Sequence, residues 1–363
     1  MGVSCGIVGL PNIGKTTVFN AMTGAKAERT TYASSSVEPN VAEIDVPDER
    51  LALIEGFIPT QKVVAAKVKV VDIAGLAEGA SRGVGIGNKF LGHIKETDAL
   101  MQVVQCFESP QVSRERPVDP QADMEILELE LAAADFETVS RNADRVAKKA
   151  RTGDKDAVFE KELFERAKAL LEDGVLLRTA EWKPAERAAL RPLFLLTLKP
   201  MLYVANVSDD DQAGEGPFAQ AVKKHAAAMG SESLAICGDL ECELAGMGDE
   251  DRAMFMQDFG VTELARPRLV RETYALLGLQ TFFTAGEKEI KAWTIQRGDT
   301  GPVAAGKIHS DFEKGFVRAE IYSVDDLVQH HTEAAIKLAG KLRIEGRDYV
   351  MRESDVCHFL VNR

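Results

Sequence analysis

Eight residues near the N-terminus have the types and spacing of a phosphate-binding loop. Residues 9–16 are Gly-Leu-Pro-Asn-Ile-Gly-Lys-Thr, which matches the pattern Gly-x-x-x-x-Gly-Lys-Thr. Backbone N–H groups of such a loop can surround a phosphate, because its glycines permit conformations and close approaches that side chains would block. Lys15 should reach the β- and γ-phosphates of a nucleotide, and the Thr16 hydroxyl should ligate Mg²⁺. We therefore predict a P-loop that holds a nucleoside triphosphate.

A second motif provides a carboxylate for the same site. Asp72-Ile73-Ala74-Gly75 follows the strand that we expect at residues 68–71. An Asp that ends a strand beside a P-loop holds Mg²⁺, usually through water. Gly75 can present its backbone N–H to the γ-phosphate, so we predict catalytic roles for Gly75 and Lys15. The alternative is a strand that ends in an ordinary turn begun by Asp72.

A third motif bears on the choice of base. Asn206-Val207-Ser208-Asp209 follows the apolar residues 201–205, at the place where GTPases carry Asn-Lys-x-Asp. The Asp of that motif accepts from N1–H and N2–H₂ of guanine, and the Lys stem packs over the base. Val207 replaces the lysine, so half of the guanine clamp is missing, whereas Asp209 keeps guanine possible. The motif favours ATP modestly.

The residue after Gly75 bears on the rate of hydrolysis. Ras-like enzymes have a glutamine there that orients the attacking water, whereas this sequence has Leu76. An apolar side chain cannot align water, so intrinsic hydrolysis should be slow unless another group, an ion or a partner completes the site. The glycine-rich stretch 79–92 either orders around the γ-phosphate or is a flexible surface loop.

Strands alternating with helices should position these motifs. Hydrophobic patterning predicts a helix at 16–23 and strands at residues 3–9, 63–71, 99–106 and 201–205. This alternation predicts an α/β fold with a mostly parallel sheet that is covered on both faces.

Two further regions differ from that pattern. Residues 120–175 have helical spacing, an interruption at Gly153-Asp154 and a helix-capping Gly174, which predicts an inserted antiparallel helical hairpin. A solvated structural arm and a binding arm are about equally compatible with it. Alternating residues at 288–295 and 316–322, with glycines between them, predict a small β-rich terminal domain.

Composition excludes some classes of protein. The 363 residues are 45% hydrophobic and 28% charged, and no apolar run approaches the ~18–20 residues of a membrane span. The N-terminus lacks the features of a secretory signal, and the five cysteines contain no Cys-x-x-Cys pair, so we expect reduced thiols in the cytoplasm. The net charge of −13 weighs against a free DNA-binding protein, although local basic patches could still dock on a ribonucleoprotein.

Longer segments carry a family resemblance. Residues 6–17, Val-Glu-Pro-Asn at 37–40, Asp-Ile-Ala-Gly-Leu at 72–76 and Gly-Asn-Lys-Phe-Leu at 87–91 together resemble the YchF subfamily of Obg-like translation-factor ATPases. Residues 304–320 resemble the TGS domain of that family. The resemblance spans nearly the whole chain. It implies a P-loop domain at 1–118 and 190–277, an inserted helical coiled-coil arm at 119–189, and a ubiquitin-like TGS domain at 278–363.

The resemblance also implies properties of the site. It implies ATP preference, binding to the ribosome as 50S subunit and 70S particle, and a possible contact with RNA. In the family Asn-x-x-Glu replaces the GTPase signature, and this chain has Asp209 in place of the Glu. A family Thr that completes Mg²⁺ coordination corresponds to Ser36. Asn12 matches an asparagine that ligates K⁺ in potassium-activated relatives, or else it tolerates an unusual backbone angle in the loop.

The sequence therefore predicts a slow Mg²⁺-dependent ATPase that acts as a nucleotide-dependent switch on the ribosome and modulates translation or a stress response. Residues 109–117 contain no histidine, so no general base is assigned. An Obg-like GTPase and a nucleotide-gated binding module with incidental hydrolysis remain alternatives. The predicted nucleotide contacts are Asn12, Ile13, Gly14, Lys15, Thr16, Thr17, Asn206, Val207 and Asp209, and the predicted metal ligands are Thr16, Ser36 and Asp72.

Overall fold

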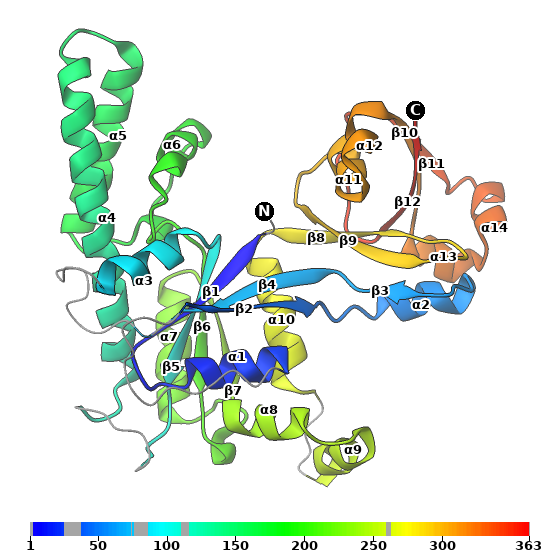
Figure 1. Ribbon diagram of the computed structural model, residues 1–363, viewed down its shortest axis with the longest axis horizontal. Coiled ribbons are helices and arrows are strands. Elements are labelled where there is room, and N and C mark those ends of the chain that lie inside the picture. The colour runs from blue at the N-terminus through cyan, green and yellow to red at the C-terminus, as the bar shows by residue number, and fades with distance from the viewer. Residues whose placement is uncertain are drawn as a thin grey trace. The chain divides into compact units, whose positions relative to one another are not determined.

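The computed structural model describes residues 3–24, 38–73, 75, 86–109, 116–258 and 263–362. Contacts between residues divide the chain into two compact units, which Figure 1 shows as ribbons. Unit 1 comprises residues 1–42 and 69–269, and unit 2 comprises residues 43–68 and 270–363. Residues 43–68 thus group with the C-terminal segment, a grouping that the sequence did not indicate.

A six-stranded sheet contains the strand that leads into the predicted P-loop. Its order is β2-β4-β1-β5-β6-β7, and the pairs β4–β1, β1–β5, β5–β6 and β6–β7 are parallel. Strands β1, β5 and β6 are buried throughout, as expected for parallel strands covered on both faces. The predicted α/β fold with a mostly parallel sheet is confirmed. The strands are β1 (Ser4–Val8), β2 (Asn40–Asp45), β4 (Lys67–Asp72), β5 (Ala99–Gln105), β6 (Met201–Asn206) and β7 (Glu232–Ile236).

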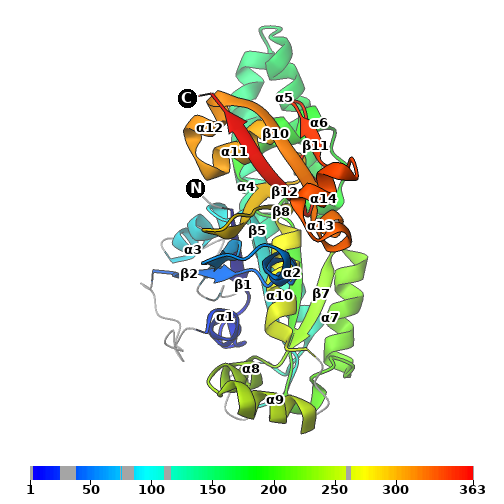
Figure 2. The ribbon, with the colours of Figure 1, turned by 90° about the vertical axis from the view of Figure 1, so that its right-hand side faces the viewer.

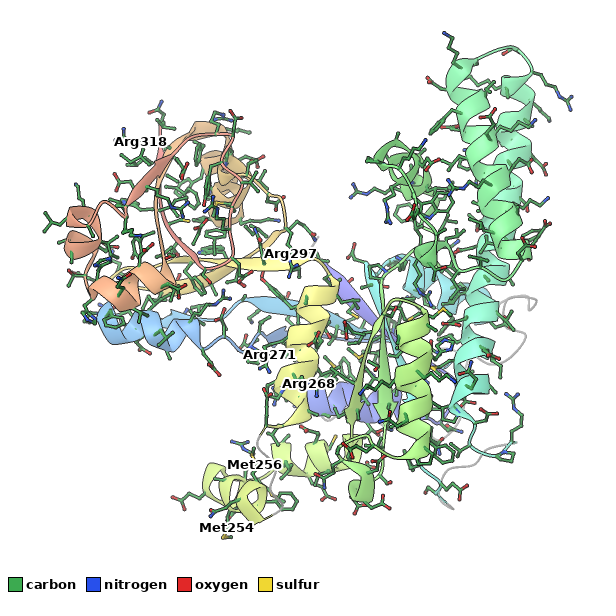
Figure 3. The ribbon with its side chains drawn as sticks, turned by 180° about the vertical axis from the view of Figure 1, so that it is seen from behind. Met254, Met256, Arg268, Arg271, Arg297 and Arg318 are labelled. Atoms are coloured by element: carbon green, nitrogen blue, oxygen red, sulfur yellow. The ribbon has the colours of Figure 1, made fainter. Side chains whose placement is uncertain are left out.

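Helices connect these strands. Helix α1 starts directly after the P-loop, as predicted, and α8 packs against it. Helix α9 carries Met254, which is 61% exposed, and Met256, which is half-buried (Figure 3). No helix of the described residues is both long and apolar enough to cross a membrane. The helices are α1 (Lys15–Thr23), α3 (Ile86–Lys95), α7 (Pro217–Ala228), α8 (Gly238–Ala245), α9 (Asp249–Asp258) and α10 (Ala265–Leu276).

The predicted helical hairpin is present as α4 (Pro120–Ala150) and α5 (Lys155–Glu172), which lie side by side in Figure 1. Asp119 and Asp154 cap the two helices by accepting bonds from backbone N–H groups, at 3.1 and 3.0 Å. Gly174 follows α5 with a φ of 74°, in the left-handed conformation of a C-terminal cap. Three short segments then lead back to the sheet: η2 (Leu177–Thr179), α6 (Pro184–Leu190) and η3 (Arg191–Leu193).

A buried charged cluster joins this arm to the sheet. Glu128 Oε1 on α4 lies 2.9 Å from Arg178 Nη2 and 3.2 Å from His225 Nε2, and it accepts from the hydroxyl of Tyr203 on β6. Burial alone would raise the pKa of Glu128, but the hydrogen bonds from His225 and Tyr203 and the charge of Arg178 hold it below its ordinary value. The root of the arm is therefore fixed by interactions that require an ionised carboxylate.

Unit 2 contains the predicted β-rich region. Its sheet has the order β11-β10-β12-β8-β9-β3, and Figure 2 shows α11 and α12 side by side next to β10 and β12. Arg50 on α2 donates to Asp48 at 2.6 Å and to Ser354 at 2.8 Å, which holds residues 48–57 to the C-terminal segment. The elements are α2 (Arg50–Phe57), β3 (Val63–Val64), β8 (Leu279–Thr284), β9 (Ile290–Gln296), α11 (Gly301–Ile308), α12 (Ser310–Gly315), β10 (Phe316–Ser323), α13 (Val324–His330), α14 (Glu333–Leu338), β11 (Arg343–Glu345) and β12 (Asp355–Val361).

The prediction of one strand over residues 63–71 is wrong. Val63–Val64 pairs with β9 in the sheet of unit 2, whereas Lys67–Asp72 pairs with β1 in the sheet of the nucleotide-binding fold. Between them the carbonyl of Ala66 accepts from the N–H of Val46 at 2.8 Å. Strand propensity is continuous along this stretch, but the two halves pair with different partners, and pairing partners cannot be deduced from propensity.

Candidate nucleotide-binding site

The P-loop connects β1 to α1 through two residues with left-handed backbone conformation. The φ of Asn12 is 62° and that of Gly14 is 91°. A Cβ at Gly14 would lie 2.3 Å from Asn206 Nδ2, so only glycine fits there. Asparagine is one of the few other residues that adopt this conformation readily. Two explanations for Asn12 followed from the sequence, an unusual backbone angle or a role as K⁺ ligand. The backbone angle is present, and K⁺ binding stays a prediction.

Lys15 lies inside the curve of the loop. Its Nζ is 2.6 Å from the carbonyl oxygen of Leu10, and the residue is 7% exposed. Burial lowers the pKa of Lys15 to about 8, although the charge of Asp72 acts in the opposite direction. A buried ammonium can interact strongly with phosphate, because little water screens its charge.

Thr16 and Asp72, two of the predicted metal ligands, lie together. Thr16 Oγ1 donates to Asp72 Oδ2 at 2.9 Å, and Asp72 is 6% exposed. A hydroxyl and a carboxylate are oxygen ligands of the kind Mg²⁺ takes, so these residues fit that ion. The third predicted ligand, Ser36, lies outside the described residues.

Asn40 is a residue of this cluster that sequence reasoning missed. Its Nδ2 donates to Asp72 Oδ2 at 3.1 Å, the same oxygen that accepts from Thr16. The Val-Glu-Pro-Asn segment was noted only as a family resemblance, without a role for its asparagine. Asn40 begins β2, the neighbour of β4, whose last residue is Asp72. This adjacency of strands brings the two side chains together.

Gly75 lies against the P-loop. A Cβ at this position would come within 2.8 Å of Pro11 Cα and 2.9 Å of Lys15 Nζ. The structure therefore brings together the two residues for which catalytic roles were predicted. Leu76 and the part of the glycine-rich stretch up to residue 85 lie outside the described residues, as do residues 110–115.

Asn206 ties the P-loop to the first residue of α8. Its Nδ2 donates to the carbonyl oxygen of Ile13 at 3.0 Å, and its Oδ1 accepts from the N–H of Gly238 at 3.2 Å. It is 4% exposed. Thr17 packs nearby, because a Cβ at Gly238 would lie 3.0 Å from Thr17 Cγ2. Asn206 thus holds the loop in position through both ends of its amide.

The other two residues of the predicted base motif differ in exposure. Val207 is 2% exposed, and its side chain lies in the hydrophobic core. Its N–H donates to the carbonyl oxygen of Ile236 at 2.9 Å. The side chain of Val207 is therefore not available to contact a nucleotide. Asp209 begins the short helix η4 (Asp209–Asp211) and is exposed. Burial, together with the charges of Asp239 and Asp209, raises the pKa of the Cys237 thiol.

The fold and this loop define a P-loop nucleotide hydrolase. A family model described as a 50S ribosome-binding GTPase matches residues 4–140. A second model, for the C-terminal part of YchF GTPases and described as a protein of unknown function, matches residues 279–362.

Whole-chain comparisons identify the family. The chain is 45% identical over 363 residues to a protein of Escherichia coli O157:H7, and 43% identical over 366 residues to one of Bacillus subtilis strain 168. Both relatives are named ribosome-binding ATPase YchF, and each comparison covers 100% of both chains. The solved structure of the Schizosaccharomyces pombe YchF GTPase matches with a TM-score of 0.87 and 34% identity, over 99% of this chain and 98% of that one. The chain belongs to the YchF family, as its sequence motifs predicted.

Proposed function

We propose that this protein is a Mg²⁺-dependent ATPase that binds the ribosome and whose bound nucleotide alters that binding. The observation that carries the proposal is the convergence of Lys15, Gly75 and the Thr16–Asp72 pair at one edge of the parallel sheet. In open α/β sheets, ligands bind at the carboxyl ends of the strands. Relatives that match over the full chain are named ribosome-binding ATPases, which supports both the reaction and the partner.

Each residue has a defined role in this mechanism. The backbone N–H groups of Asn12, Ile13 and Gly14 and the ammonium of Lys15 would neutralise the phosphates, with Thr17 close to the same loop. Thr16, Asp72 and Ser36 would hold Mg²⁺, which would supply positive charge to stabilise the triphosphate. The N–H of Gly75 would donate to the γ-phosphate and so distinguish triphosphate from diphosphate.

Hydrolysis in this mechanism is slow. Leu76 follows Gly75 at the position where related enzymes carry a glutamine that aligns water. Stimulation would then come from a partner or from K⁺ held near Asn12. A rate that is equal in K⁺ and Na⁺ would exclude the role of the ion.

We propose ATP as the preferred nucleotide, and GTP is the second candidate. The names of similar proteins disagree on this point, because the curated relatives are named ATPases and the solved relative a GTPase. Val207 supports ATP, since a side chain buried in the core cannot pack over a base as the lysine of GTPases does. The exposed Asp209 supports the GTPase alternative, because its carboxylate is free to accept from guanine.

A nucleotide-gated binding module is the candidate from a different class. In such a module the bound state alone regulates a partner, and hydrolysis is incidental. The apolar Leu76 favours it. We also propose that the chain consists of a P-loop domain, an arm at 119–189 and a TGS domain at 278–363. A cytoplasmic location is proposed as well, and the five free cysteines support it.

Single-turnover hydrolysis of ATP and GTP, with and without purified 70S ribosomes and 50S subunits, tests the proposal. The expected result is slow ATP cleavage that ribosomes accelerate, that requires Mg²⁺, and that Lys15→Ala abolishes. Nucleotide-dependent ribosome binding without any acceleration would favour the binding module. Absence of both acceleration and nucleotide-dependent binding would contradict the regulatory ATPase.

A further inference from the structure

Helix α10 begins in unit 1 and ends in unit 2, because the boundary between the units falls between Leu269 and Val270. The first N–H groups of a helix have no acceptor within the helix itself. Leu264, the residue directly before α10, has no polar side chain that could cap them. Pro267 removes one of these donors, since proline has no N–H. The start of α10 therefore needs an acceptor from another part of the chain.

Glu241 on α8 supplies this acceptor. Its Oε1 accepts from the N–H of Ala265, the first residue of α10, at 2.6 Å, and Glu241 is 7% exposed. Burial raises the pKa of Glu241, whereas the N–H groups of Ala265 and Arg266 and the charge of Arg266 act in the opposite direction. A carboxylate is also favoured at the positive end of the helix dipole. The cap of α10 thus comes from a residue 24 positions earlier in the chain.

Helix α8 is also attached to the nucleotide site. The N–H of Gly238, its first residue, donates to Asn206 Oδ1 at 3.2 Å, and the Nδ2 of the same amide donates to the carbonyl oxygen of Ile13 in the P-loop at 3.0 Å. One turn further along α8, Cys242 Sγ donates to the carbonyl oxygen of Thr17 on α1 at 3.4 Å. A change in the P-loop or at the start of α1 therefore acts on α8 through both contacts.

The C-terminal half of α10 is attached to the sheet of unit 2. The hydroxyl of Tyr274 donates to the carbonyl oxygen of Gln280 at 3.1 Å and lies 3.0 Å from Thr281 Oγ1, and both residues belong to β8. Tyr274 is buried, whereas Arg268 and Arg271 lie on the exposed side of α10 (Figure 3). One continuous helix therefore connects the Glu241 cap in unit 1 to a strand of unit 2.

We propose that Glu241 couples the nucleotide bound at the P-loop to unit 2, by capping α10 more persistently when a triphosphate is bound. The inference rests on the proposed function and specifies how the nucleotide regulates a second part of the chain. A triphosphate would restrict the P-loop backbone and, through Asn206 and Cys242, helix α8. Glu241 then keeps its bond to Ala265 for a larger fraction of the time, so the start of α10 opens less often. Glu241 is a positioning residue, because it acts on α10 and not on the nucleotide.

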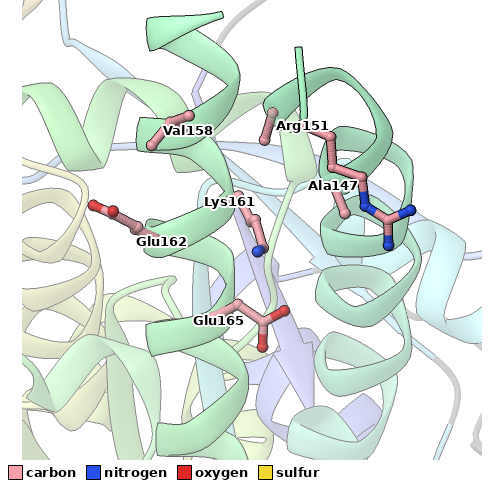
Figure 4. A pocket seen from close by; sticks show the side chains of 7 residues that line it. Ala147, Arg151, Val158, Lys161, Glu162 and Glu165 are labelled. Carbon is pink, nitrogen blue, oxygen red and sulfur yellow. The ribbon is translucent and has the colours of Figure 1, made fainter. Parts of the chain in front are cut away.

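Amide hydrogen exchange of the full-length protein tests this coupling. Exchange in residues 265–276 is measured with MgADP and with the Mg²⁺ complex of a non-hydrolysable ATP analogue, for wild type, Glu241→Ala and Glu241→Gln. Glu243→Ala is the matched control, because Glu243 also lies on α8 but is exposed. The end of the arm, where Ala147 and Val158 line a depression between α4 and α5 (Figure 4), is the internal reference. Binding of fluorescent ATP confirms that each variant is folded.

In the wild type, the ATP analogue is expected to slow exchange in residues 265–276 at least about fivefold relative to ADP, as typical coupling energies imply. Glu241→Ala should exchange rapidly and equally with both nucleotides, because α10 has lost its cap. Glu241→Gln should keep most of the difference, since its amide oxygen can still accept from Ala265. Glu243→Ala should behave as wild type. The affinity for 70S ribosomes should depend on the nucleotide in wild type and Glu243→Ala, but not in Glu241→Ala.

The other outcomes are distinguishable. Equal exchange of α10 with both nucleotides in the wild type overturns the coupling, and this result requires no variant. A Glu241→Ala variant that exchanges faster but keeps the difference between nucleotides identifies a purely structural cap and also overturns it. An equal change at the internal reference indicates general stabilisation by the ligand, with the same consequence. Ribosome binding by the wild type that does not depend on the nucleotide contradicts the proposed function itself, whereas the exchange of α10 still decides the coupling.

Discussion

Replacing Asn206 by alanine tests whether this residue holds the P-loop in position. The side chain bonds to two buried backbone groups, the carbonyl of Ile13 and the N–H of Gly238. In Asn206→Ala both groups lose their partner. A base-contacting asparagine would instead affect the choice of nucleotide without supporting the fold.

The size of the effect follows from the two bonds. A buried polar group left without its partner costs about 1–3 kcal/mol, so two such groups cost roughly 2–6 kcal/mol. Stability changes of this kind shift the melting temperature of a unit of ~150–250 residues by about 2–4 °C per kcal/mol. We therefore expect the unfolding transition of unit 1 to fall by about 4–24 °C, with a loss of nucleotide affinity.

The assay is thermal unfolding followed by circular dichroism and by calorimetry, without nucleotide. Asp209→Ala is the matched control, because Asp209 comes from the same motif but is exposed. Its melting temperature should equal that of the wild type within the error expected for surface substitutions, about 0.5 kcal/mol. An Asn206→Ala variant that melts with the wild type would refute the structural role and favour a contact with the base.

Three other substitutions test separate parts of the site and its support. Gly75→Ala should lower single-turnover hydrolysis at least about 100-fold without unfolding the protein, because its Cβ would come within 2.8 Å of Pro11 Cα; wild-type turnover would contradict this. Asn40→Ala should weaken the Mg²⁺ dependence of nucleotide binding, since Asp72 loses the donor at 3.1 Å, and fluorescent nucleotide titrations at several Mg²⁺ concentrations would detect it. Glu128→Gln should destabilise unit 1 by about 3–5 kcal/mol at pH 7. The pKa of Glu128 is lower in the folded state than in the unfolded state. Its contribution to the free energy of unfolding is therefore fully present above the unfolded-state pKa and is lost as the pH falls through the folded-state pKa. Melting temperatures measured from pH 7 to pH 3 should fall less steeply in the Glu128→Gln variant than in the wild type.

Local patterns were sufficient to predict the elements that carry the site. The P-loop and its flanking strand and helix were predictable because glycine, lysine and threonine at fixed spacing act through a few consecutive backbone groups. The hairpin was predictable because the apolar periodicity of residues 120–175 is long and is interrupted only at Gly153-Asp154, where the turn lies. In both cases the signal lies within one segment of the chain.

Features that depend on pairing between distant segments were not predictable. Residues 43–68 group with unit 2 through contacts such as Arg50 with Ser354 and the pairing of Val63 with Ile290, none of which leaves a local pattern. The role of Asn40 depends on β2 lying beside β4. The helical periodicity of residues 120–175 predicted the arm, but the burial of Glu128 on α4 depends on hydrogen-bonding partners from three other segments.

The most direct test of the account is a calorimetric titration of the wild type and of Lys15→Ala with MgATP and then with MgGTP. The account predicts that the wild type binds ATP more tightly than GTP and that the variant binds neither. Tighter binding of GTP would contradict the ATPase assignment and identify Asp209 as the residue that reads the base, and unchanged binding by Lys15→Ala would contradict the site itself.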